Sequence, residues 1–263
     1  MKLPKPKYTD KFIQNPDEVR IQSGEVVSIY SIADDLTDDE KNEWAKHILA
    51  HYIKEADIDR GARIGGKTRA EYIEQSILPL TSLRNGSEVS GVFGEIVFCD
   101  FIEHTLGYSV PRYKLFGTFP GNPNQGIDII AYKFDKTKRS NDTALYAEIK
   151  AVLSRTQFNK LQDAILDSEK RPDKDFALAL DAARRKLEMM GDVEEAADIA
   201  RFEDSETPCK RIKSAGLITA SNSCASDNFV GISITVGKKI ESHVIYATDL
   251  WNLAKDLWRR ACS

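Results

Sequence analysis

The sequence predicts an α/β protein in which a mixed central sheet is flanked by helices. The strongest helical pattern runs from 87 to 107, and strand-like segments follow it at 126–132 and 144–151. A second helical tract spans 156–201, before further strand-like segments. This order of elements is typical of a sheet packed between helices.

The first 86 residues are predicted to form an N-terminal α/β extension. Thr37 and Glu40 stand three residues apart at the start of a helical periodicity, which is the capping-box pattern of a helix start. In chain order, the predicted elements are an extended lead-in (1–24), a strand (25–32), a helix from Thr37 to about Ala56, a Gly- and Arg-rich loop (60–69) and a helix (70–77).

Residues 87–263 are predicted to hold the core of the fold, with a helical insertion at about 156–205. Apolar residues cover most of the circumference of the first helix, so we expect it to be buried on several sides and to end at Gly107. The elements expected after it are strands at 108–116, 126–132 and 144–151, helices over 156–201 with a break at 171–173, strands at 215–220, 229–236 and 243–247, and a terminal helix from Thr248.

The composition is ordinary for a soluble globular protein, with 41% hydrophobic and 30% charged residues among 263. Because the net charge is −4, any nucleic acid must be bound by a local basic surface. The four cysteines form no CxxC pair, which favours a reducing cytoplasm over a disulfide scaffold or a zinc site. No apolar run follows the N-terminal lysines and no segment approaches 18 uninterrupted apolar residues, so we expect neither a signal peptide nor a membrane span.

An acid and a base lie two residues apart in the strand 144–151. Side chains alternate across a strand, so Glu148 and Lys150 are expected on one face and their apolar neighbours on the other. Alone, such a pair is more typical of an exposed cross-strand ion pair. Asp128 in the neighbouring apolar strand and Glu95 in the middle of the apolar helix change that interpretation, because an isolated carboxylate is costly in either place.

A divalent cation would remove the repulsion between carboxylates that lie close together. Oxygen ligands suit Mg²⁺ (or Mn²⁺), which keeps coordination positions for water and substrate phosphate. A lysine beside such an ion can position the attacking water and neutralise charge that builds on a phosphoryl group. These residues therefore indicate metal-assisted hydrolysis of a phosphodiester.

This ordered set of residues resembles the PD-(D/E)XK nuclease superfamily over roughly 87–236. The resemblance implies a restriction-endonuclease-like core with a mixed sheet and flanking helices. It also implies roles for four residues: Asp128 and Glu148 as metal ligands, Glu95 as an additional ligand, and Lys150 as the base that orients water. The segment Gly126-Ile127-Asp128 departs from the common Pro-Asp form, which the superfamily tolerates because only the acid contacts metal.

A narrower resemblance is to the nuclease subunit of the Hachiman anti-phage system, the HamA family. It is carried by Gly94-Glu95, by Gly126-Ile127-Asp128, by the Glu-x-Lys strand and by the long helical insertion. It implies DNA as the substrate and a helicase as the partner protein. The nuclease domains of Cap4-type effectors are similar and stay open as an alternative.

A second motif competes with this interpretation. The segment from Gly61 to Thr68 matches the phosphate-binding loop pattern GxxxxGK[ST]. The residues before it are too charged for a central parallel strand, so a P-loop nucleotide-binding protein is the less favoured hypothesis. A basic loop that contacts nucleic-acid phosphates, or a simple solvated loop, fits the segment better. The residues expected at such a nucleic-acid interface are Arg60, Arg63, Lys67 and Arg69, together with Gln157 after the Glu-x-Lys strand.

The sequence thus predicts a cytoplasmic, Mg²⁺-dependent deoxyribonuclease that acts with a helicase in anti-phage defence. The alternative is a catalytically silent subunit that binds DNA or serves as an adaptor in the same complex. His47 and His51 are spaced i, i+4 but lack the glutamate of a zinc-protease motif, so they are interpreted as ordinary surface or half-buried histidines.

Overall fold

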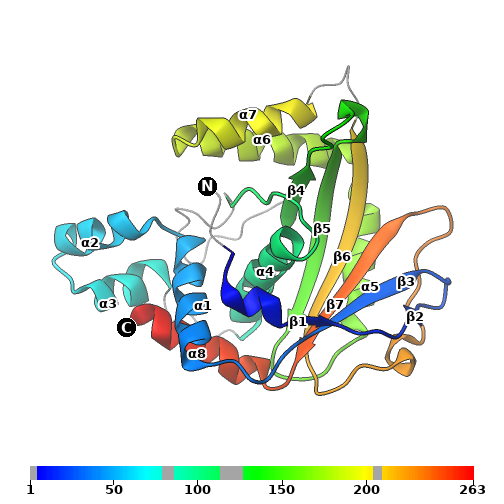
Figure 1. Cartoon of the computed structure of the whole chain (residues 1–263), viewed down its shortest axis with the longest axis horizontal. Helices are drawn as coiled ribbons and strands as arrows, with labels where there is room; N and C mark the ends of the chain where they lie inside the picture. The colour runs from blue at the N-terminus through cyan, green and yellow to red at the C-terminus, as the bar shows by residue number, and fades with distance from the viewer. Residues whose placement is uncertain (1–4, 79–85, 113–126, 204–208) are drawn as a thin grey trace.

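A curled, mixed sheet of seven strands runs through the residues that the computed structural model describes, 5–78, 86–112, 127–203 and 209–263 (Figure 1). The strand order is β1-β3-β7-β6-β5-β4, and β2 pairs with β3. The middle strands, β3, β7, β6 and β5, are parallel, whereas β4, β1 and β2 pair antiparallel at the edges. The strands are β1 (Phe12–Gln14), β2 (Val19–Arg20), β3 (Val26–Ile32), β4 (Ile129–Lys133), β5 (Thr143–Val152), β6 (Lys210–Ala220) and β7 (Ile240–Ala247).

Helices cover both faces of this sheet, so the predicted mixed α/β class is confirmed. None of the helices in the described part of the chain combines the length and the apolarity needed to cross a bilayer. The α-helices are α1 (Asp38–Ala50), α2 (Glu55–Ile64), α3 (Arg69–Tyr72), α4 (Gly86–His104), α5 (Lys160–Lys170), α6 (Asp173–Met189), α7 (Val193–Glu203) and α8 (Leu250–Cys262). Shorter helical turns are η1 (Lys7–Lys11), η2 (Ile73–Ile77), η4 (Arg139–Asn141) and η5 (Ser226–Phe229).

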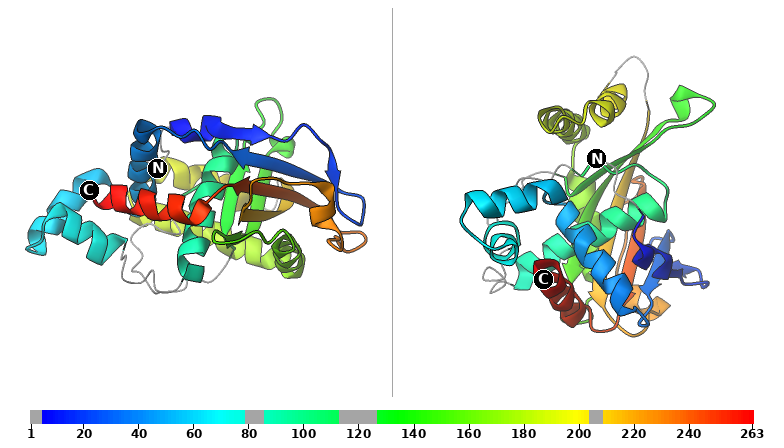
Figure 2. Two further views of the ribbon diagram at one scale, coloured as in Figure 1. Left: turned by 90° about the horizontal axis from the view of Figure 1, so that it is seen from below. Right: turned by 60° about the vertical axis from the view of Figure 1, so that its left-hand side comes forward.

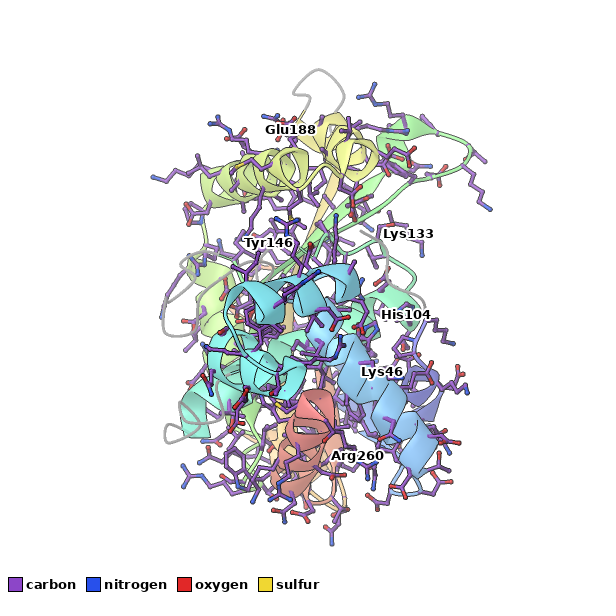
Figure 3. The ribbon with its side chains drawn as sticks, turned by 90° about the vertical axis from the view of Figure 1, so that its left-hand side faces the viewer. Lys46, His104, Lys133, Tyr146, Glu188 and Arg260 are labelled. Carbon is purple, nitrogen blue, oxygen red and sulfur yellow. The ribbon has the colours of Figure 1, made fainter. Side chains whose placement is uncertain are left out.

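Strand β5 shows how the two faces differ. Leu145, Ala147 and Ile149 pack in one core with residues of α1, α4 and α8. On the opposite face, Ala144 and Tyr146 pack against α6 and α7, and Figure 3 marks Tyr146 beneath these two helices. The same face continues on β6, where residues of α5 cover Ala215 and Leu217. Because side chains alternate along a strand, Glu148 and Lys150 belong to the α5 face, as predicted.

The N-terminal segment contributes to this same sheet and core. Strand β3 pairs parallel with β7, and Tyr8 stacks on Trp44 at a ring-centroid distance of 3.7 Å within the α4 core. Helices α1 and α8 pack side by side, although more than 200 residues separate their starts (Figure 2). Arg260 joins them, because its guanidinium donates to Asp38 at 2.6 Å and to Asn42 at 2.8 Å.

Two expected elements in the first third of the chain differ from the structure. The capping box at Thr37 and Glu40 is present, but α1 ends at Ala50 and not near Ala56. The chain leaves the helix at His51, whose ring lies beside the buried Asp100 carboxylate. The predicted loop 60–69 is also wrong over its first half, because residues 60–64 belong to α2.

The strand predicted at 229–236 is absent from the described structure. Phe229 ends η5, and the buried Ile232 and Ile234 pack on α5 as part of a loop. Its backbone N–H groups find side-chain acceptors in place of a strand ladder: Gln162, Ser23 and Glu169 accept from Ser233, Ile234 and Thr235 at 2.7, 2.9 and 2.6 Å. The apolar residues of this segment are buried, but the segment is not part of the sheet. The strand expected at 108–116 is reduced to an isolated bridge from Ser109 to Tyr132, and its last residues lie outside the described part of the chain.

The P-loop hypothesis is wrong, because the segment from Gly61 to Thr68 folds as a helix, a turn and the start of a second helix. Gly65 N–H donates to Gly61 O and Lys67 N–H to Ala62 O, both at 2.9 Å, so these donors are not available to cradle a phosphate. The Thr68 hydroxyl caps α3 by accepting from the Glu71 N–H at 3.2 Å. The α-carbon of Gly61 faces the Tyr72 ring, so an added Cβ would displace the end of this side chain.

Two glycines of α4 are expected to differ in how substitution by alanine changes the stability of the protein. A Cβ at Gly94 would lie 2.5 Å from the Cβ of Ala151 on β5, whereas a Cβ at Gly91 would meet nothing within 4 Å. We therefore expect Gly94→Ala to lower the free energy of unfolding by about 1–3 kcal/mol through overpacking. Gly91→Ala should raise it by about 0.5–1 kcal/mol, because alanine is the better helix former. Urea unfolding of both variants measures the pair, and equal shifts of their midpoints would contradict the α4–β5 contact.

Candidate functional site

The pairing of β4 with β5 sets two carboxylates against each other. Ile129 pairs with Ala147 in the antiparallel register, so Asp128, one residue before β4, comes opposite Glu148. The Asp128 carboxylate accepts a hydrogen bond from the Ile149 N–H, with its Oδ2 2.9 Å from the nitrogen. A side chain thus takes the place of the strand backbone at the point where β4 has not yet begun. Asp128 is thereby held at the β5 edge.

Glu148 is a buried acid with a perturbed pKa. Its side chain is 5% exposed, and its Oε1 accepts from the Nε of Arg171 at 2.8 Å. The pKa of Glu148 is raised to about 7: burial is the largest cause and the Asp128 carboxylate adds to it, while Arg171 and Lys150 act in the opposite direction. A carboxyl group in this condition is typical of a functional site more than of a structural ion pair.

Lys150 lies on the same face and faces an open pocket. Its Nζ is 2.7 Å from Asp167 Oδ2 on α5, and its side chain is 33% exposed. Burial lowers the pKa of Lys150, but the hydrogen bond and charge of Asp167 outweigh burial, so the pKa ends above its usual value. The pocket measures about 430 Å³ and lies between the end of β5 and α5. Its lining comprises Lys150, Ala151, Val152, Lys160, Asp163, Leu166, Asp167 and Lys170.

Glu95 projects from α4, the helix that packs on the other face of the sheet. It is half-buried, and it follows Gly94, which contacts Ala151 near the end of β5. Burial raises the pKa of Tyr52, and the charge of Glu95 adds to this effect, so the two side chains are neighbours. Among described residues, Glu95, Asp128 and Glu148 are not a set of three whose oxygens all lie within 4.8 Å of one another.

The donors at Asp128 and Glu148 fit a hard divalent cation. Both supply carboxylate oxygens, the ligand type that Mg²⁺ and Mn²⁺ prefer. Burial and the nearby Asp128 carboxylate both raise the pKa of Glu148, so its charged form is disfavoured in this site. A cation between the two acids would relieve their mutual repulsion, so the metal prediction is chemically consistent with this pair.

The residues predicted to contact nucleic acid lie in two places. Arg60 and Arg63 are exposed on α2 and form no ion pair with any described residue. Arg69 is paired with Glu55 and with Asp59, which neutralises much of its charge locally. Lys67 lies 3.4 Å from the Ser76 hydroxyl.

Gln157 is half-buried just before α5. Its backbone N–H donates to Thr219 Oγ1 at 3.0 Å, which ties this segment to the end of β6. These distances do not test whether Gln157 or the basic residues around α2 and α3 contact nucleic acid, so both contacts stay predictions.

The structure also gathers a buried polar network that the sequence interpretation missed. Asp100 on α4 is fully buried and accepts from the Tyr8 hydroxyl. His47 Nε2 lies 2.8 Å from Asp100 Oδ1, and Arg112 Nη2 donates to the same oxygen at 2.7 Å. The signal available in the sequence was an acid one residue before Phe101, in the most apolar helix of the chain.

The network contains a group of metal-ligand type, His47, His51 and Asp100, but it holds its own cation. Arg112 Nε donates to His51 Nε2 at 3.3 Å, and the Arg112 guanidinium also pairs with Glu103. Burial lowers the pKa of His51 to about 4, so its ring is neutral and accepts this bond. Because a guanidinium already satisfies Asp100 and His51, a metal ion would be repelled there. The network instead ties together η1, α1, α4 and the segment after α4.

We predict that Asp100→Asn lowers the free energy of unfolding by about 3 kcal/mol, because it removes one of the two carboxylates that pair with the buried Arg112. Asp17→Asn is the matched control, since Asp17 is exposed, and it should change stability by less than about 0.5 kcal/mol. Urea denaturation measures both. Equal midpoints for the two variants, or a Zn²⁺-dependent rise in the wild-type midpoint, would contradict the role given to Arg112.

The raised pKa of Glu148 predicts that its carboxyl group destabilises the folded state as the pH rises. A carboxyl whose pKa is raised in the folded state supports folding fully below its unfolded pKa of about 4.3 and loses that support as the pH rises to about 7. Glu148→Gln should therefore match wild type at pH 4 and exceed it by about 3 kcal/mol at pH 8. Denaturant unfolding in the presence of a chelator measures this difference. The exposed Glu194→Gln provides the control, and a similar pH-dependent gain there would refute the assignment to Glu148.

A comparison with protein families completes the description of the site. The family model described as HamA matches residues 6–250, which is more than half of the chain. The match includes the helix with Glu95, both strands of the acidic pair and the α5–α7 insertion. No curated protein matches the chain.

Proposed function

Because this chain belongs to the HamA family, and is thus a component of the Hachiman anti-phage defence system that works with a protein partner, we propose that it is the nuclease of that system. The proposed reaction is metal-dependent hydrolysis of DNA phosphodiester bonds, on a core of the PD-(D/E)XK type. One observation carries the proposal. Asp128 is held at the edge of β5 opposite a buried Glu148 whose pKa is raised to about 7, with Lys150 two residues further on the same face.

Each residue has a distinct role in this proposal. Asp128 and Glu148 hold Mg²⁺ or Mn²⁺, and Glu95 is an additional ligand that approaches from α4. The bound ion supplies Lewis-acid polarisation of the scissile phosphoryl group and lowers the pKa of a water ligand. Lys150 keeps its proton, since its pKa is raised beside Asp167, and acts as an ammonium that orients the attacking water and offsets phosphoryl charge.

The position of Lys150 supports a polyanionic substrate. Its ammonium faces the pocket of about 430 Å³, which Lys160 and Lys170 also line. Asp163 and Asp167 pair with these lysines, and the lysines outnumber the acids in the lining. Phosphate groups of a DNA strand are the anions that such a surface attracts. The protein as a whole carries a charge of −4, so this local cluster and the exposed Arg60 and Arg63 are the surfaces proposed to guide DNA. The partner proposed to deliver DNA is a helicase.

A catalytically silent DNA-binding or adaptor subunit is the competing function. It is favoured by the fact that both Glu148 and Lys150 are paired internally, with Arg171 and Asp167. Such pairing alone would also stabilise a site that has lost its chemistry. The two functions differ in their response to removal of the acid or the base.

We predict that Glu148→Ala and Lys150→Ala each lower the rate of DNA cleavage by the assembled complex by at least about 10³-fold, because each removes a group that acts on the reacting phosphate. The fold and the DNA affinity should be retained, as shown by circular dichroism and by a gel-shift titration. Plasmid nicking with Mg²⁺, with and without the partner, measures the rate. Wild-type rates in both variants would rule out this site, and a wild-type complex that never cleaves would favour the adaptor.

A further inference from the structure

The acid and the base of β5 are matched by a base and an acid on the next helix. Glu148 pairs with Arg171 at 2.8 Å, and Lys150 pairs with Asp167 at 2.7 Å. Asp167 lies in the last turn of α5, and Arg171 is the residue that directly follows this helix. Glu148 and Lys150 are two apart on one face of a strand. The two pairs therefore form a quartet in which each charge of β5 meets its opposite from α5.

The backbone around Arg171 is held independently of its guanidinium. Arg171 ends α5 in an extended conformation, as expected of a residue that precedes a proline. Lys213 Nζ on β6 donates to the Arg171 carbonyl at 2.7 Å. The guanidinium also lies 3.9 Å from Asp175, one turn into α6. Arg171 is thus anchored at its main chain and has a second carboxylate within reach of its side chain.

The two pairs differ in what they leave accessible. Lys150 and Asp167 both line the pocket of about 430 Å³, so their contact sets the direction of the ammonium in the pocket. Glu148 is nearly inaccessible, and Arg171 takes one of its two oxygens. A metal cation bound by Glu148 would lie beside the Arg171 guanidinium on the same carboxylate. Because the two positive charges repel each other, they compete for Glu148.

We propose that Asp167 and Arg171 are positioning residues of the Glu148–Lys150 site. Asp167 fixes the Lys150 ammonium for its work on the substrate phosphate. Arg171 holds Glu148 until a divalent cation takes the carboxylate, and then turns toward Asp175. This inference rests on the proposed nuclease function and extends it to residues outside the acid–acid–base set.

The Asp167 arm of the test uses the complete complex with Mg²⁺ and a DNA substrate. Asp167→Ala should lower kcat by about tenfold or more and leave KM within about twofold, because a misdirected ammonium affects the reacting phosphate more than DNA binding. Asp167→Glu should restore part of kcat, which a folding defect would not allow. Asp227→Ala is the control, since Asp227 is exposed and does not line the pocket.

The Arg171 arm measures binding of Mn²⁺ alone to the full-length chain by calorimetry, without DNA. Arg171→Ala should bind Mn²⁺ about fivefold or more tightly than wild type, because the competing positive charge is removed. Lys174→Ala removes an exposed positive charge nearby and is the control, with an affinity expected within about twofold of wild type. In the cleavage assay, Arg171→Ala should still require Glu148.

The outcomes separate this inference from the function on which it rests. If Asp167→Ala cleaves as fast as Asp227→Ala, or if Arg171→Ala gains no Mn²⁺ affinity, the corresponding positioning role is refuted while the nuclease assignment stands. If Glu148→Ala and Lys150→Ala cleave normally, the proposed function fails first. A wild-type chain that binds no Mn²⁺ and a complex that cleaves no DNA would overturn both.

Discussion

The candidate site depends on the antiparallel register of β4 and β5. This register brings Asp128 opposite Glu148, and the Asp128 carboxylate then replaces β4 as the acceptor for the Ile149 N–H. A shift of one residue would turn Glu148 and Lys150 toward the apolar core of α4 and bring Leu145, Ala147 and Ile149 to the α5 face. The apolar face of β5 therefore enforces the position of the polar one.

Two of the buried acids, Asp100 and Glu148, have different roles. Asp100 is fully buried, but its polar neighbours, His47 first among them, outweigh burial and hold the pKa of Asp100 well below its usual value. Its carboxylate links the N-terminal turn and α1 to α4, so its charge stabilises the fold. Glu148 has a raised pKa because burial and Asp128 are only partly offset by Arg171. The acid that is satisfied supports the fold, and the one that is not satisfied is the better candidate for chemistry.

Local patterns predicted some elements well and others poorly. The capping box at Thr37, the buried helix that became α4, and the strand that became β5 all follow from interactions within a few residues. The loop around Ile232 and Ile234 was mistaken for a strand because its N–H groups are satisfied by side chains from distant parts of the chain. The motif at Gly61 was mistaken for a loop because its glycine permits close packing of α2 against Tyr72, a contact that the motif letters do not encode.

For the site, the sequence correctly predicted that Glu148 and Lys150 share a face of one strand, because side-chain alternation is a property of the local backbone. It also pointed to Asp128, since a carboxylate in an apolar strand needs a reason. The residues that pair with these side chains could be identified only from the tertiary structure. Asp167 lies on α5 and Arg171 at its end. Helix α5 brings them over β5 because it packs on Ala215 and Leu217 of β6, the parallel neighbour of β5. Packing between distant elements, not any pattern along the chain, completes the quartet.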